Sequence, residues 1–136
     1  HTRYWRDWSS DVCSSDLSEF AALGISDLGT RASANGILPV FFPITDMNPP
    51  REGDRGAYIR LIEGIISAAS AGQNVVIHCR AGIGRSGLVA ASVLVARGLT
   101  TVDAIKVVRE VRSPRSVETA EQLAWVRGLE DAFNLV

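Results

Sequence analysis

The sequence contains few of the residues that mark a disulfide-stabilised or metal-binding protein. Its 136 residues include two cysteines, two histidines and one methionine. Two cysteines cannot form a disulfide framework. So few histidines and cysteines, with no clustered carboxylates beside them, do not suffice for a zinc site or a two-metal site. We therefore expect no metal, no cofactor and a reducing, cytoplasmic location.

Long apolar runs and an excess charge of one sign are also missing. The longest apolar runs, 88–91 and 93–96, fall far short of the roughly 20 residues that a spanning helix needs, and the chain opens with no apolar signal-peptide core. The 14 basic side chains nearly balance the 15 acidic ones. We therefore expect one globular domain with no nucleic-acid or membrane partner. The oligomeric state stays open.

The first 17 residues differ in composition from everything that follows. They read HTRYWRDWSSDVCSSDL and show neither helical nor strand periodicity. They resemble the translation of a short-read sequencing adapter, although a genuine polar tail is the alternative. We interpret 1–17 as a non-native, adapter-derived segment and exclude it from the fold prediction. In the remaining 18–136, Cys79 is the only cysteine and the adjacent His78 the only histidine.

The rest of the chain predicts alternating helices and strands, which is the pattern of an α/β domain. Runs of apolar and β-branched residues predict strands at 37–42 and 75–79. Prolines 43, 49 and 50 mark an extended loop that carries Asp46. Helical spacing or apolar composition predicts helices at 18–23, 27–34, 58–69, 86–96, 100–112 and from 119 onwards. Thr100 with Asp103, and Thr119 with Gln122, are spaced as capping boxes.

The chemistry concentrates in residues 78–87, which read HCRAGIGRSG and join a predicted strand to a predicted helix. The amino end of a helix presents unpaired N–H groups that can hold a phosphate dianion. Glycines allow the backbone to approach such a ligand closely. The predicted phosphate-binding residues are Arg80, Ala81, Gly82, Ile83, Gly84 and Arg85. Arg80 is equally compatible with a solvated side chain.

Three side chains of this segment have predicted chemical roles. Arg85 supplies a planar fork of donors to two phosphate oxygens. Cys79 lies where N–H dipoles and Arg85 favour a thiolate, which makes it a nucleophile, although a lone cysteine is commonly a small core residue. Ser86 can donate a hydrogen bond to that sulfur when it leaves.

Cys-x5-Arg-Ser, preceded by His and opening a helix, resembles the signature of the cysteine-dependent protein tyrosine and dual-specificity phosphatases. A second segment, Phe42–Pro50 (FPITDMNPP), resembles that superfamily's general-acid loop. Segments 19–50 and 113–122 look similar to the branch around the cyclin-dependent-kinase-associated phosphatases. The resemblance implies that Asp46 is the general acid and that His78 supports the loop through hydrogen bonds. Asp46 could also be an ordinary turn residue, and Gln122 a water-positioning residue rather than a helix cap.

The resemblance implies hydrolysis of phosphotyrosine on proteins through a cysteinyl phosphate, and it leaves phosphoserine and phosphothreonine open. A phosphoinositide phosphatase, a non-catalytic phosphate-binding module and a redox-sensing thiolate are the alternatives. The implied fold is a dual-specificity-phosphatase-like sheet flanked by helices that lacks its N-terminal strands. We expect the two remaining strands to pair directly or to leave a gap, because a polar stretch such as 8–16 does not read as a central strand. The chain as written should then fold poorly and be weakly active.

Overall fold

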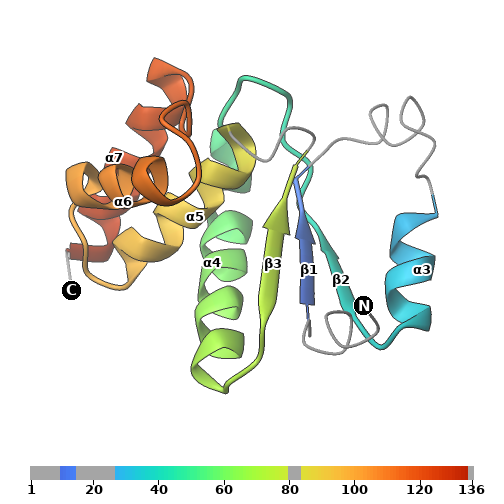
Figure 1. Ribbon diagram of the computed structural model, residues 1–136. Coiled ribbons are helices and arrows are strands. Elements are labelled where there is room, and N and C mark those ends of the chain that lie inside the picture. Colours follow the sequence, from blue (N-terminus) through green and yellow to red (C-terminus); the bar gives the residue numbers. More distant parts are fainter. Residues whose placement is uncertain (1–9, 15–26, 80–83, 135–136) are drawn as a thin grey trace.

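The computed structural model of the chain describes residues 10–14, 27–79 and 84–134. Its centre is a parallel sheet of three strands in the order β2-β1-β3 (Figure 1). The strands are β1 (Ser10–Cys13), β2 (Leu38–Phe41) and β3 (Val75–His78). Cys13 pairs with Phe41 on one side and with His78 on the other. All three strands therefore end at the same edge of the sheet.

Strand β1 overturns our expectation for the central position of the sheet. The polar stretch was expected to form no strand, and β2 and β3 to pair directly or leave a gap. Ser10–Cys13 instead lies between them and pairs in parallel with both. Val12 and Cys13 are each 1 % exposed. Two apolar side chains suffice for a strand at the centre of this sheet because the strand is only four residues long. Its pairing with β2 and β3 uses backbone groups, which every non-proline residue has.

The helices lie on both sides of this sheet (Figure 1). Helices α4 and α5 contact β3, while α3 contacts β2 at the opposite end. Helices α6 and α7 pack on α5 and extend the molecule away from the sheet. The helices are α3 (Leu28–Ala34), the 3-10 turn η1 (Glu52–Asp54), α4 (Arg55–Ser70), α5 (Gly84–Ala96), α6 (Thr101–Val111) and α7 (Ala120–Asn134).

These bounds confirm most of the predicted elements. The strands expected at 37–42 and 75–79 and the helices expected at 27–34, 58–69, 86–96, 100–112 and from 119 onwards are present, with ends shifted by a few residues. The helix predicted at 18–23 lies outside the described residues.

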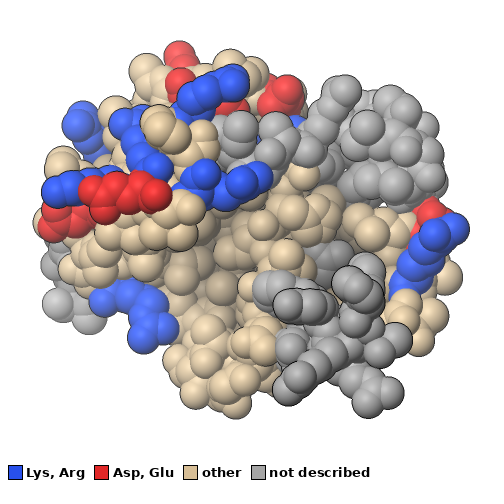
Figure 2. All heavy atoms as spheres, in the orientation of Figure 1, with Lys and Arg blue, Asp and Glu red and all other residues tan. Residues whose placement is uncertain are grey.

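Figure 2 shows that charged side chains on the viewed face gather over α6 and α7, in the upper left of the view.

The core lies between the sheet and the helices α4 to α7. Tyr58 of α4 is fully buried, and its ring meets those of Phe42 and Trp125 edge to face, each with centroids 5.5 Å apart. Its Oη lies 2.7 Å from Oγ of Ser92 on α5. Because Ser92 Oγ donates to the Leu88 carbonyl, Tyr58 is the donor to Ser92. This contact fixes α4 against α5, the helix that follows the predicted phosphate-binding segment.

Both predicted caps are present at the starts of α6 and α7. Thr100 Oγ1 accepts from Asp103 N at 3.2 Å, and Thr119 Oγ1 accepts from Gln122 N at 3.1 Å. The Gln122 side chain returns the bond, since its Oε1 accepts from Thr119 N. Across the described ranges, no helix combines the length and apolar character needed to cross a membrane.

Candidate functional site

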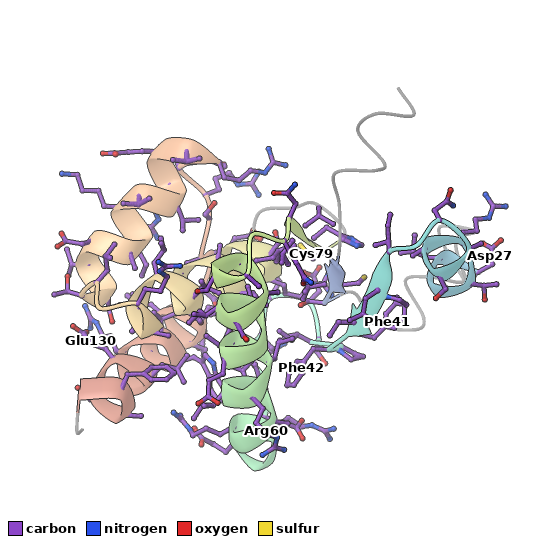
Figure 3. The ribbon with its side chains drawn as sticks, turned by 90° about the horizontal axis from the view of Figure 1, so that it is seen from below. Asp27, Phe41, Phe42, Arg60, Cys79 and Glu130 are labelled. Carbon is purple, nitrogen blue, oxygen red and sulfur yellow. The ribbon has the colours of Figure 1, made fainter. Side chains whose placement is uncertain are left out.

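The site lies at the edge where the three parallel strands end. Chain segments that leave the carboxyl ends of parallel strands meet at one edge of the sheet, which is where α/β folds place ligand sites. Ser14 follows β1, the loop carrying Asp46 follows β2, and Cys79 follows β3. Figure 3 shows Cys79 near the middle of the molecule, close to the sheet and α5.

Cys79 and Ser86 are brought together as the sequence predicts. The Sγ of Cys79 lies 3.5 Å from Oγ of Ser86, one residue at the end of the strand and the other in the first turn of α5. Cys79 is half-buried and Ser86 is 6 % exposed. This half-buried position differs from that of a small buried core cysteine, which was the alternative. The serine hydroxyl is positioned to donate to the sulfur once the thiol has lost its proton.

Arg85 is almost completely buried, with 2 % of its side chain exposed. Its Nη1 donates to the Ile44 carbonyl at 2.9 Å and lies 3.5 Å from the Ser14 carbonyl. Its Nε lies 3.6 Å from Oδ1 of Asp46. A buried cation is stable only with partners of this kind, because burial removes its hydration. Arg85 therefore links α5 to the segments that follow β1 and β2.

Asp46 lies in a tight turn and also faces the site. Asn48 N donates to the Thr45 carbonyl at 3.0 Å, and Met47 N donates to Oδ1 of Asp46 at 3.0 Å. Met47 has φ of 66°, a conformation uncommon outside glycine. The carboxylate, 64 % exposed, is thus open to solvent on one side and paired with Arg85 on the other. Asp46 is therefore a turn residue that also lies beside Arg85, and its role as a general acid stays a prediction.

Other predicted site residues are placed only in part. His78 is half-buried in β3, and its carbonyl accepts from Ser14 N at 3.0 Å. Gly84 is the first residue of α5 and is buried. Arg80, Ala81, Gly82 and Ile83 lie outside the described residues.

Sequence reasoning missed two carbonyl groups of this site and one contact of Gln122, a residue that it had named as a helix cap or a water-positioning residue. The carbonyls of Ser14 and Ile44 had no signal, since every residue has a carbonyl. Gln122 is fully buried, and besides its cap its Nε2 lies 3.4 Å from the Asn48 carbonyl. It therefore ties α7 to the loop that carries Asp46. A glutamine among the apolar positions of a helix face is the signal that could have indicated this.

A hollow of about 710 Å³ lies beside the same loop. Pro43, Pro49 and Pro50 line it, together with the acidic side chains of Asp54 and Glu121. The arrangement as a whole can hold an anion at the amino end of α5, next to a sulfur atom and within reach of a carboxylate.

Comparison with known sequences identifies a protein family and a curated relative. The family model described as "Polymorphic toxin system, DSP-PTPase phosphatase" matches residues 15–99, more than half of the chain. Cyclin-dependent kinase inhibitor 3 of Rattus norvegicus is 28 % identical over 118 residues, which are 85 % of this chain and 53 % of the relative. The chain thus spans about half the length of this curated relative.

Solved structures share the fold. Kinase-associated phosphatase, with its catalytic-site cysteine changed to serine, superposes with a TM-score of 0.86 at 20 % identity, over 96 % of this chain and 73 % of that one. Tk-PTP in its active form superposes with a TM-score of 0.78 at 29 % identity, over 96 % of this chain and 83 % of that one. PTPMT1 in complex with PI(5)P superposes with a TM-score of 0.82 at 16 % identity, over 98 % of this chain and 85 % of that one. The predicted fold and the similarity to the kinase-associated branch are confirmed.

Proposed function

Because the chain belongs to the DSP-PTPase phosphatases of polymorphic toxin systems, we propose that it hydrolyses phosphomonoesters on phosphoproteins. The proposed substrate is phosphotyrosine, with phosphoserine and phosphothreonine as further candidates. The observation that carries the proposal is the 3.5 Å approach of Cys79 Sγ to Ser86 Oγ beside the buried Arg85.

In the proposed first step, the Cys79 thiolate attacks the phosphorus of a monoester held at the amino end of α5. The S–P bond forms as the P–O bond to the leaving group breaks, and Asp46 gives its proton to the departing oxygen. Arg85 donates to two phosphate oxygens, in the bidentate geometry that lysine lacks. The product is a cysteinyl phosphate, and the alcohol or phenol leaves.

In the proposed second step, Asp46 takes a proton from water, whose oxygen then attacks the phosphorus. The S–P bond breaks, and the electron pair returns to the sulfur. Ser86 donates a hydrogen bond to the forming thiolate, which makes it a better leaving group. Inorganic phosphate is released. Neither step calls for a metal or a redox cofactor.

The ion pair between Arg85 and Asp46 supports the placement of the loop that carries Asp46 beside the proposed phosphate site. It holds the loop carboxylate over the amino end of α5 before a substrate arrives. The proline-lined hollow beside the loop offers room for side chains that flank a phosphorylated residue. A protein substrate needs such room, whereas a free phosphate does not.

Release of phosphate from para-nitrophenyl phosphate in the presence of a chelator tests the proposal. We expect turnover in chelator, and none in Cys79→Ser. A phosphate-binding module without turnover would bind phosphate but release none from the ester. Phosphotyrosine, phosphoserine and phosphothreonine peptides and PI(5)P, assayed side by side, then rank the protein and lipid substrates.

A further inference from the structure

Glu118 lies against the first turn of α5, although nothing in the sequence marks it as a site residue. A Cβ atom at Gly84 would overlap the Glu118 carboxylate. Gly84 is the first residue of α5 and directly precedes Arg85. The side chain of Glu118 is 20 % exposed. Its carboxylate therefore lies at the helix end where the proposed function places a phosphate.

The segment that carries Glu118 is held in a strained conformation. Val117 has φ of 58° and is 3 % exposed. A β-branched residue rarely adopts such a φ, so other contacts must offset its cost. Arg109 of α6 supplies two of them: its Nε donates to the Ser116 carbonyl at 2.9 Å and its Nη2 to the Val117 carbonyl at 3.1 Å.

Two further contacts fix the segment, one against α7 and one against α5. Gln122 Oε1 accepts from Glu118 N at 2.8 Å. A Cβ atom at Gly87 would lie 3.0 Å from Cβ of Ser116, so the absence of a side chain at Gly87 permits the close approach. The position of the Glu118 carboxylate thus follows from contacts with α6, α7 and α5 together.

Among the residues that the structure describes, the charge of Glu118 is only weakly compensated. Its Oε2 lies 3.6 Å from Nη2 of Arg115, whose side chain is 74 % exposed. An ion pair as open as this one is strongly screened by water. A negative carboxylate at the amino end of α5 repels a second anion at the same place, and the low dielectric of a partly buried site strengthens that repulsion.

We propose that Glu118 is an affinity-determining residue of the phosphate site: its carboxylate weakens the binding of a phosphate dianion and so speeds release of the inorganic phosphate product. The proposal rests on the proposed function, because it assumes that the amino end of α5 binds phosphate. Arg109 is the positioning residue, since it holds the strained segment that directs Glu118 to Gly84.

Inhibition by inorganic phosphate tests this role. We expect Glu118→Gln, which keeps the shape and removes the charge, to lower the inhibition constant of phosphate about tenfold, equivalent to about 1.4 kcal/mol. KM for para-nitrophenyl phosphate should fall in parallel. The control is Glu63→Gln on the exposed side of α4, which changes the net charge equally and should leave both values unchanged. Unchanged or weaker phosphate inhibition in Glu118→Gln overturns the proposal.

Direct titration of inorganic phosphate into Cys79→Ser separates this inference from the proposed function. If Cys79→Ser binds phosphate and adding Glu118→Gln does not tighten it, only the inference fails. If Cys79→Ser binds no phosphate and the unmodified chain has no turnover, both fail.

Arg109→Lys tests the positioning role. It keeps the charge but loses the fork of two donors, so phosphate inhibition should strengthen as Glu118 moves away. When Glu118 is already Gln, Arg109→Lys should change phosphate affinity by less than half of the change that it causes in the unmodified chain. The reason is that the two residues act through one carboxylate. Full additivity of the two substitutions would overturn the positioning role. Arg127→Lys, on the exposed face of α7, is the matched control.

Discussion

Arg85 and Asp46 form an ion pair across the site, with Nε of the arginine 3.6 Å from Oδ1 of the aspartate. The arginine is 2 % exposed and the aspartate 64 %. The same guanidinium donates to Ile44, two residues before Asp46. A buried cation at the start of α5 therefore holds in place the loop that carries the proposed general acid. The two segments that resemble phosphatase motifs are joined physically by this arginine.

Replacing Asp46 by asparagine tests whether its carboxyl group transfers a proton. Asp46→Asn should slow cleavage of esters with poor leaving groups by about 10²- to 10⁴-fold, because only these need protonation as they depart. Esters with good leaving groups, such as para-nitrophenyl phosphate, should lose much less in the bond-cleavage step. Rates of product burst for a series of aryl phosphates measure the difference. An equal loss along the series would assign Asp46 a purely structural role in its turn.

Arg85→Lys keeps a positive charge and removes the planar fork. We expect kcat/KM to fall by about 10²-fold or more, since one ammonium cannot reproduce two parallel hydrogen bonds to phosphate. Thermal unfolding of the same variant separates this loss from destabilisation, because the lysine also loses contacts with Ile44 and Ser14. A folded Arg85→Lys variant with near-normal kcat/KM would show that the arginine acts only through its charge at a distance.

The buried, central position of strand β1 predicts how substitutions in it change the free energy of unfolding. Val12 is 1 % exposed between β2 and β3, so Val12→Asp should lower the free energy of unfolding by about 3 kcal/mol or more, through burial of an unpaired charge. Val102, in the first turn of α6, is 67 % exposed. Val102→Asp should therefore change the free energy by less than about 0.5 kcal/mol. Equal effects in urea unfolding would mean that β1 does not occupy the centre of the sheet.

The adapter interpretation of 1–17 remains a prediction about the origin of that segment. Independent sequencing of the coding DNA decides it. If the genuine upstream residues differ, the chain that carries them should unfold at a higher temperature and turn over substrate faster than the present one. Equal stability and activity would contradict the expectation that the present chain folds poorly.

Tyr58 makes stability depend on pH in the alkaline range. Burial is the main cause that raises the pKa of its phenol well above the ordinary value, because the buried side chain disfavours the charged phenolate. The unfolded chain ionises this tyrosine near pH 10. The neutral folded form is therefore favoured below that pH, and stability falls as pH rises above it.

Tyr58→Phe should remove this contribution to the alkaline slope. At neutral pH it should cost about 1 kcal/mol for the lost hydrogen bond. Urea unfolding of both proteins at pH 7, 9 and 11 measures the two effects. Parallel curves for Tyr58→Phe and the unmodified chain at all three pH values would contradict the assignment.

Local patterns predicted the elements whose side chains carry a clear period. The apolar positions of α4, the β-branched run of β3 and the Thr119–Gln122 cap all follow from neighbouring residues. Strand β1 was missed because its position depends on backbone pairing with β2 and β3, which a polar sequence does not reveal. Glu118 and Arg109 were missed for a related reason. The strained backbone at Val117 and the close approach to Gly84 arise only when α6, α7 and α5 pack together.

The central claim is that Cys79 carries the phosphoryl group between the two steps, and trapping that intermediate tests it most directly. The chain is mixed with excess phosphoester, quenched rapidly in acid, digested and analysed by mass spectrometry. We predict one phosphate, located on the peptide that contains Cys79 and absent from Cys79→Ser treated in the same way. Steady turnover with no phosphate on Cys79, or undiminished turnover by Cys79→Ser, would contradict the account.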